Sequence, residues 1–77
     1  MNILIINGPN LNLIGLREPN IYGSETLNDI KIWIESLDFT KGHTINWYQS
    51  NHEGEIIDKL HEAMNDNTEG IIINPGA

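Results

Sequence analysis

The chain has 77 residues, a formal net charge of -7 and no cysteine. This length corresponds to one small domain, residues 1–77, whose limited core leaves little margin of stability. The absence of cysteine excludes disulfides and thiolate metal sites, and the four basic residues are too few for the phosphate contacts of a nucleic-acid-binding protein.

No apolar segment approaches the length of a membrane-spanning helix. The first residues also lack the basic segment that opens a secretion signal. We therefore expect a cytoplasmic protein that binds neither membranes nor nucleic acid. Because so short a chain buries little surface by itself, we further expect it to form a homo-oligomer.

The first predicted element is an apolar run, Ile3–Ile6, which is typical of a strand buried on both faces. Gly8 and Pro9 end this strand, and a long loop follows. In α/β sheets, ligands bind at loops of this kind, after the carboxyl end of a strand. The loop contains Arg17 and Tyr22, and a guanidinium beside a phenol favours the phenolate, a possible general base. The alternative is an ordinary surface loop with a solvated arginine and a packed tyrosine.

A helix and an edge strand are predicted next. Thr26 followed three residues later by Asp29 has the form of a helix N-cap. Apolar residues then recur at helical spacing, which predicts a helix over Thr26–Asp38. The segment His43–Tyr48 alternates between apolar and polar residues, as expected for a half-exposed edge strand.

The second predicted helix begins after Asn51, which we expect to be its cap, with Glu53 in the favourable first turn. Its predicted core face consists of Ile56, Ile57, Leu60, Ala63 and Met64. The β-branched run Ile71–Ile73 then predicts a third strand, covered on both faces.

The order of these elements is strand, helix, strand, helix, strand, with short connections. This order predicts an α/β fold with a parallel sheet and right-handed crossovers. If the alternating strand lies at an edge, the spatial order of the strands is 2-1-3 and the helices cover opposite faces. The third strand then has an open edge, which is a template for association. We therefore expect a two-fold dimer.

Four motifs stand in a characteristic order along the chain. They are Asn7-Gly8-Pro9-Asn10-Leu11-Asn12-Leu13, Arg17-Glu18-Pro19 with Ile21-Tyr22-Gly23, Gln49-Ser50-Asn51-His52-Glu53-Gly54, and Ile73-Asn74-Pro75-Gly76-Ala77. Together they resemble the N-terminal half of type II 3-dehydroquinate dehydratase, also called type II dehydroquinase. The resemblance implies a truncated flavodoxin-like three-layer fold.

The resemblance also implies a chemistry. The family enzyme is a lyase of the shikimate pathway that removes water from 3-dehydroquinate to give 3-dehydroshikimate, for aromatic amino-acid biosynthesis, without a metal or organic cofactor. Tyr22 matches the general base of the family and Arg17 matches the residue that lowers its pKa. Asn10 matches an asparagine that holds the water at the enolate oxygen, and Asn74 matches a substrate-binding asparagine.

Each of these residues also has a purely structural interpretation. Asn10 could be a turn residue that bonds its own backbone, and Asn74 could be an extended residue before proline. Ser50, Asn51 and Glu53 match a motif near the family site, but a helix cap followed by an acid explains them equally well.

Several parts of the family site have no match in this chain. They are the general-acid histidine, a Ser-Asn pair that grips the substrate carboxylate, and a later arginine. The histidines His43, His52 and His61 lie at other places, and their spacing does not indicate a metal site. We therefore expect the chain alone to be inactive or nearly so, and a dimer rather than the dodecamer of the family. The alternatives are a non-catalytic binding or assembly protein that keeps the fold, or a segment whose other half is encoded separately.

Overall fold

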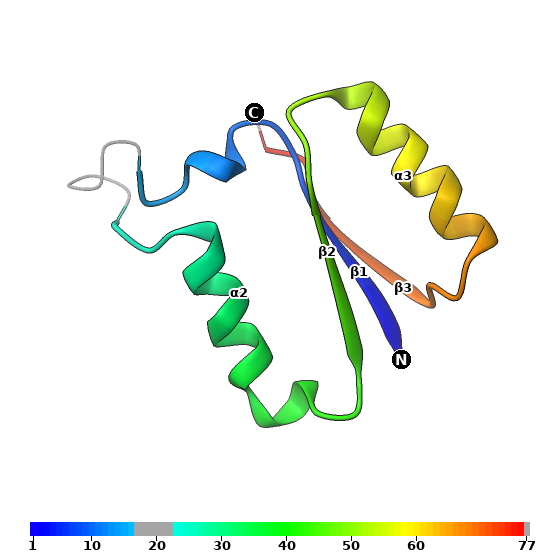
Figure 1. The fold of residues 1–77 in the computed structure, drawn as a ribbon, viewed down its shortest axis with the longest axis horizontal. Helices are drawn as coiled ribbons and strands as arrows, with labels where there is room; N and C mark the ends of the chain where they lie inside the picture. Colours follow the sequence, from blue (N-terminus) through cyan, green and yellow to red (C-terminus); the bar gives the residue numbers. More distant parts are fainter. Residues whose placement is uncertain (17–22, 77) are drawn as a thin grey trace.

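The computed structural model describes residues 1–16 and 23–76 and contains, within them, three strands and two α-helices. These elements are β1 (Asn2–Asn7), α2 (Leu27–Ser36), β2 (Thr44–Gln49), α3 (Glu53–Asn65) and β3 (Gly70–Asn74). Two 3-10 turns, η1 (Leu11–Leu13) and η2 (Asp38–Thr40), follow β1 and α2. The predicted order of strands and helices is confirmed (Figure 1).

The three strands form one parallel sheet in the order β2-β1-β3. The first strand of the chain therefore lies in the centre, with Asn7 opposite Gln49 on one side and Asn74 on the other. Figure 1 shows α2 and α3 on opposite sides of this sheet. The α/β class, the 2-1-3 order and the three layers are as predicted.

Helix α2 begins with a complete capping box. The hydroxyl of Thr26 accepts a hydrogen bond from the Asp29 N–H (3.1 Å), and the Thr26 N–H donates to the Asp29 carboxylate (3.0 Å). The helix ends at Ser36, two residues before the predicted end at Asp38, because the backbone of Leu37 is extended; the 3-10 turn η2 follows it. None of the residues of α2 is fully buried.

The buried apolar core lies between β1 and α3. Its side chains are Leu4, Ile6, Ile56 and Ala63. The prediction that Ile57 and Met64 belong to this core is wrong, because their side chains are 42% and 79% exposed. They directly follow Ile56 and Ala63, and one residue turns a helix by about 100°, which takes their side chains away from the sheet.

The prediction that β3 is covered on both faces is also wrong for the described residues. Ile71, Ile72 and Ile73 are 44%, 58% and 46% exposed. Their strand pairs with β1 on one side only, and the described helices bury side chains of β1 rather than of β3.

Neither α2 nor α3 is long and apolar enough to cross a membrane.

Candidate functional site

The carboxyl ends of all three strands meet at one edge of the sheet, and each strand ends in an amide residue. Asn7, Gln49 and Asn74 lie side by side in the register of the parallel ladders. A loop leaves the sheet after each of them. Ligands of open α/β sheets bind at this kind of edge, so we take it as the candidate site.

Two of these loops are in direct backbone contact. The Gly8 N–H donates to the Asn74 carbonyl oxygen over 2.8 Å. A Cβ atom on Gly8 would lie 2.1 Å from the carbonyl oxygen of Pro75, and one on Gly76 would lie 2.4 Å from that of Pro9. Both positions therefore require glycine, since no Cβ fits at such distances. The contact joins the loop that carries Asn10 to the loop that follows β3.

Asn10 has an unusual backbone conformation. Its φ of 69° and ψ of -5° lie in the left-handed region, and among the described residues no other non-glycine residue has a positive φ. Asparagine tolerates this region better than most residues do. Its carbonyl accepts a hydrogen bond from the Leu13 N–H (3.0 Å), which starts the turn η1. Asn10 is therefore a turn residue as predicted, but its side chain does not cap this turn. A catalytic role for its side chain stays a prediction.

Asn51 does not cap the second helix, contrary to the prediction. The N-cap of α3 is His52, and no side chain caps the helix there. Instead, Ser50 organises the turn: its hydroxyl accepts from the His52 N–H (3.0 Å) and donates to Glu55 Oε1 (2.7 Å). The side chain of Asn51 crosses to the neighbouring loop, where its Oδ1 accepts a hydrogen bond from the Asn10 N–H (2.9 Å).

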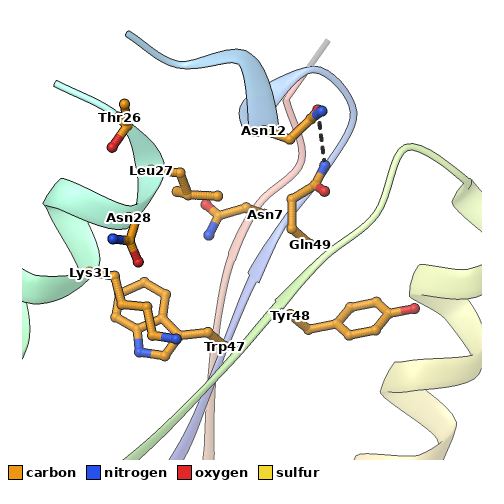
Figure 2. A pocket seen from close by; sticks show the side chains of 9 residues that line it. All are labelled: Asn7, Asn12, Thr26, Leu27, Asn28, Lys31, Trp47, Tyr48 and Gln49. Atoms are coloured by element: carbon orange, nitrogen blue, oxygen red, sulfur yellow. Dashed lines mark hydrogen bonds between the residues drawn. The ribbon is translucent and has the colours of Figure 1, made fainter. Parts of the chain in front are cut away.

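Gln49 supports the contact between Asn51 and the loop after β1. This role was not predicted from the sequence. Its Nε2 atom lies 3.1 Å from Asn51 Oδ1, 3.3 Å from the Gly8 carbonyl oxygen and 3.4 Å from Asn12 Oδ1. Figure 2 shows Gln49 reaching from the end of β2 toward Asn12. The signal that could have revealed this role is the position of Gln49 directly after the predicted strand His43–Tyr48.

Asn74 holds its own loop through its side chain. Its Oδ1 accepts a hydrogen bond from the Gly76 N–H (3.3 Å). Within the described residues, its Nδ2 has no hydrogen-bond partner. Because Asn74 is exposed, this NH₂ group can donate to an oxygen of a bound molecule.

A solvent-open hollow of about 400 Å³ lies on the α2 side of the same edge (Figure 2). Its lining residues are Asn7, Asn12, Thr26, Leu27, Asn28, Lys31, Trp47, Tyr48 and Gln49. Asn7 is only 8% exposed, and Lys31 contributes a cation 5.9 Å from the ring centroid of Trp47. No pattern in the sequence predicted this hollow.

The predicted pair Arg17 and Tyr22 lies outside the described residues, so its proximity stays a prediction. Of the four predicted site residues, Asn10 and Asn74 are described: Asn10 follows β1, and Asn74 is the last residue of β3, both at the candidate edge. Across residues 1–16 and 23–76, no three histidine, aspartate or glutamate side chains gather closely enough to hold a metal ion.

Known proteins resemble this chain along its whole length. One curated relative, the 3-dehydroquinate dehydratase of Prochlorococcus marinus, is 57% identical over 77 residues, which are 100% of this chain and 52% of the relative. The catabolic 3-dehydroquinase 2 of Neosartorya fischeri is 54% identical over 76 residues, which are 99% of this chain and 50% of that protein.

A solved structure of a type II dehydroquinase also resembles this chain. The type II dehydroquinase of Butyrivibrio crossotus superposes with a TM-score of 0.89 at 53% identity, over 100% of this chain and 53% of that one. The chain thus spans about half the length of the relatives that it matches. The family model described as dehydroquinase class II matches residues 1–77. This chain therefore belongs to the class II dehydroquinase family.

Proposed function

We propose that residues 1–77 carry the half of a 3-dehydroquinate dehydratase site that holds the general base. The observation that carries this proposal is the hydrogen bond at the point where the loops after β1 and β3 begin: the Gly8 N–H donates to the carbonyl oxygen of Asn74, the last residue of β3 (2.8 Å). It brings the loop of Asn10 and the start of the loop after β3 to one edge of the sheet. The match of all 77 residues to the family supports the same assignment.

In the proposed reaction, the Tyr22 phenolate takes a proton from the carbon next to the ketone of 3-dehydroquinate. Arg17 lowers the pKa of the phenol and so supplies the phenolate at neutral pH. Asn10 holds a water molecule against the enolate oxygen, where negative charge develops, which is the place where fixed dipoles lower a barrier most. Asn74 donates a hydrogen bond from Nδ2 to the substrate.

We further propose that these 77 residues alone turn over substrate slowly. The hydroxyl group leaves with the help of a general acid, which typically contributes about 10²- to 10⁴-fold to the rate. The family's acid histidine has no counterpart among His43, His52 and His61. His43, for example, precedes β2 at the opposite edge of the sheet, where its Nδ1 lies 2.9 Å from the N-terminal amine.

The test uses the chain itself and a chimera. In the chimera, residues 1–77 replace the part of the Butyrivibrio crossotus dehydroquinase that superposes on them, which is 53% of that chain. Formation of 3-dehydroshikimate is followed by its conjugated-enone absorbance. We expect little turnover by the chain alone, turnover by the chimera, and a large loss in the chimera with Tyr22→Phe. A folded chimera that turns over no substrate would contradict the proposal.

A second candidate is a non-catalytic binding or assembly protein. The observation that favours it is the exposure of Ile71, Ile72 and Ile73 on an edge strand, since large exposed apolar surfaces usually mark interfaces. An inactive chimera together with stable self-association of the 77-residue chain would favour this candidate over the first.

A further inference from the structure

Two amide side chains reach across to the loop after β1: that of Gln49, the last residue of β2, and that of Asn51, two residues later. We propose that Asn51, oriented by Gln49, is a positioning residue that holds Asn10 in its left-handed conformation. The proposed effect on catalysis rests on the function proposed above. The positioning of Asn10 does not, because it follows from the hydrogen bonds of Gln49 and Asn51.

The central contact is the 2.9 Å hydrogen bond from the Asn10 N–H to Asn51 Oδ1. A fixed N–H direction sets the orientation of the peptide plane before Asn10. The φ of 69° then determines where the Asn10 side chain leaves that plane. Because left-handed backbone is disfavoured for residues with a Cβ atom, a tertiary contact that selects it contributes directly to the placement of this side chain.

Gln49 decides which end of the Asn51 amide faces the loop. An asparagine amide has one acceptor oxygen and one donor nitrogen. Both neighbours of this amide are donors: the Asn10 N–H (2.9 Å) and the Gln49 NH₂ group (3.1 Å). Only the oxygen of Asn51 can satisfy both, so position 51 must present an acceptor. The Gln49 NH₂ group is fixed in turn by the Gly8 carbonyl oxygen and Asn12 Oδ1 (Figure 2).

Two substitutions of Asn51 separate this role from a general effect on stability. Asn51→Ala removes the acceptor, whereas Asn51→Asp keeps an oxygen at the same distance from the backbone. Asn51 is exposed, so neither change disturbs the core. Asn46→Ala is the matched control, because Asn46 is an exposed asparagine of β2, the strand that precedes Asn51.

The first measurement is amide hydrogen exchange of Asn10 in the 77-residue chain by NMR. From the net stabilisation of one hydrogen bond, we expect exchange in Asn51→Ala to be roughly three- to tenfold faster. Asn51→Asp and Asn46→Ala should leave it near the parent rate. An unchanged Asn10 amide in Asn51→Ala would overturn the proposal, whether or not the protein is a dehydratase.

The second measurement is steady-state kinetics in the chimera. Because Asn10 is proposed to act on the enolate, Asn51→Ala should lower kcat by about tenfold with little change in KM. Asn51→Asp should restore most of this loss. A loss that appears equally in Asn51→Ala and Asn51→Asp would overturn the catalytic consequence. An inactive parent chimera would instead contradict the proposed function, and the exchange rates would still decide the positioning.

Discussion

The backbone N–H of Gly8 lies 2.8 Å from the carbonyl oxygen of Asn74 and donates a hydrogen bond to it. This bond belongs to the parallel ladder between β1 and β3, where it closes the last register pair, Asn7 and Asn74. The chain leaves the sheet from both strands while still in contact, so the loops after β1 and β3 start as a pair. The candidate site is thus a direct continuation of the parallel sheet.

The first prediction concerns this junction. Gly8→Ala places a Cβ atom 2.1 Å from the Pro75 carbonyl oxygen, and such overpacking against backbone costs about 1–3 kcal/mol or more. We expect the free energy of unfolding in urea, followed by circular dichroism, to fall by that amount. Gly54→Ala is the control, because Gly54 lies in α3 with open space around it, and alanine stabilises a helix by up to about 1 kcal/mol. Equal urea midpoints for the two variants would contradict the prediction.

The second prediction concerns the start of α2. Thr26→Ala removes the hydroxyl that accepts the hydrogen bond from the Asp29 N–H, and the loss of such a cap costs about 1 kcal/mol. Because none of the residues of α2 is fully buried, the helix depends strongly on its cap. We expect faster amide exchange throughout α2 with little change in α3. Thr26→Ser, which keeps the hydroxyl, should behave like the parent, and the same effect in α3 would show global rather than local loosening.

The third prediction concerns association through β3. This edge strand exposes Ile72 by 58%, and an unpaired apolar edge is a template for another chain. We expect the 77-residue chain to be a dimer at micromolar concentration and Ile72→Lys to shift it toward monomer. The control is Ile32→Lys, since Ile32 of α2 is equally exposed at 59% but lies away from the edge.

Light scattering across a dilution series measures this equilibrium. A species of 8.7 kDa at every concentration, unchanged by Ile72→Lys, would show that the exposed edge does not drive association. Equal effects of Ile72→Lys and Ile32→Lys would point to general surface hydrophobicity instead of strand pairing.

The fourth prediction concerns the turn between α3 and β3. Hydrogen bonds from Thr68, among them its N–H to Asp66 Oδ1 (2.7 Å), hold the pKa of the Asp66 carboxyl below its ordinary value of 3.8. A pKa lowered by folding adds stability above the unfolded pKa, and this stability is lost as the pH falls through the folded pKa. We expect an NMR titration of Asp66 with a midpoint below 3.8. In Thr68→Val the midpoint should rise, and in Thr68→Ser it should not.

The start of α2 was predictable because its signal is local: Thr26 and Asp29 form their capping box within one helical turn. The continuous run Ile3–Ile6 and the alternating segment His43–Tyr48 also agree with the central and the edge place of their strands. The continuous run Ile71–Ile73 gave the same signal as Ile3–Ile6, yet β3 is an exposed edge strand. What covers a strand depends on the rest of the fold, which a local pattern does not contain.

The partner of Asn51 was not predictable in this way. Local preference places asparagine at a helix cap, but the neighbouring loop offers the Asn10 N–H as a competing donor. Which of the two wins depends on how β1 and β2 align in the sheet, which is tertiary information. The exposure of Met64 was missed for a different reason: apolar composition does not distinguish neighbouring positions that a helix turns to different sides.

Because β1 lies between β2 and β3, the edge of the sheet that carries Asn7, Gln49 and Asn74 can form only after all three strands have been synthesised. β1 is synthesised first, yet it pairs with two strands that the ribosome produces later. Contacts between residues so distant in sequence require the closure of long loops before they contribute any stability. Asn10 cannot form its hydrogen bond to Asn51, nor Gly8 its hydrogen bond to Asn74, before these partners have left the ribosome. The contacts of Gly8 and Asn10 are therefore complete only after the end of β3 has emerged.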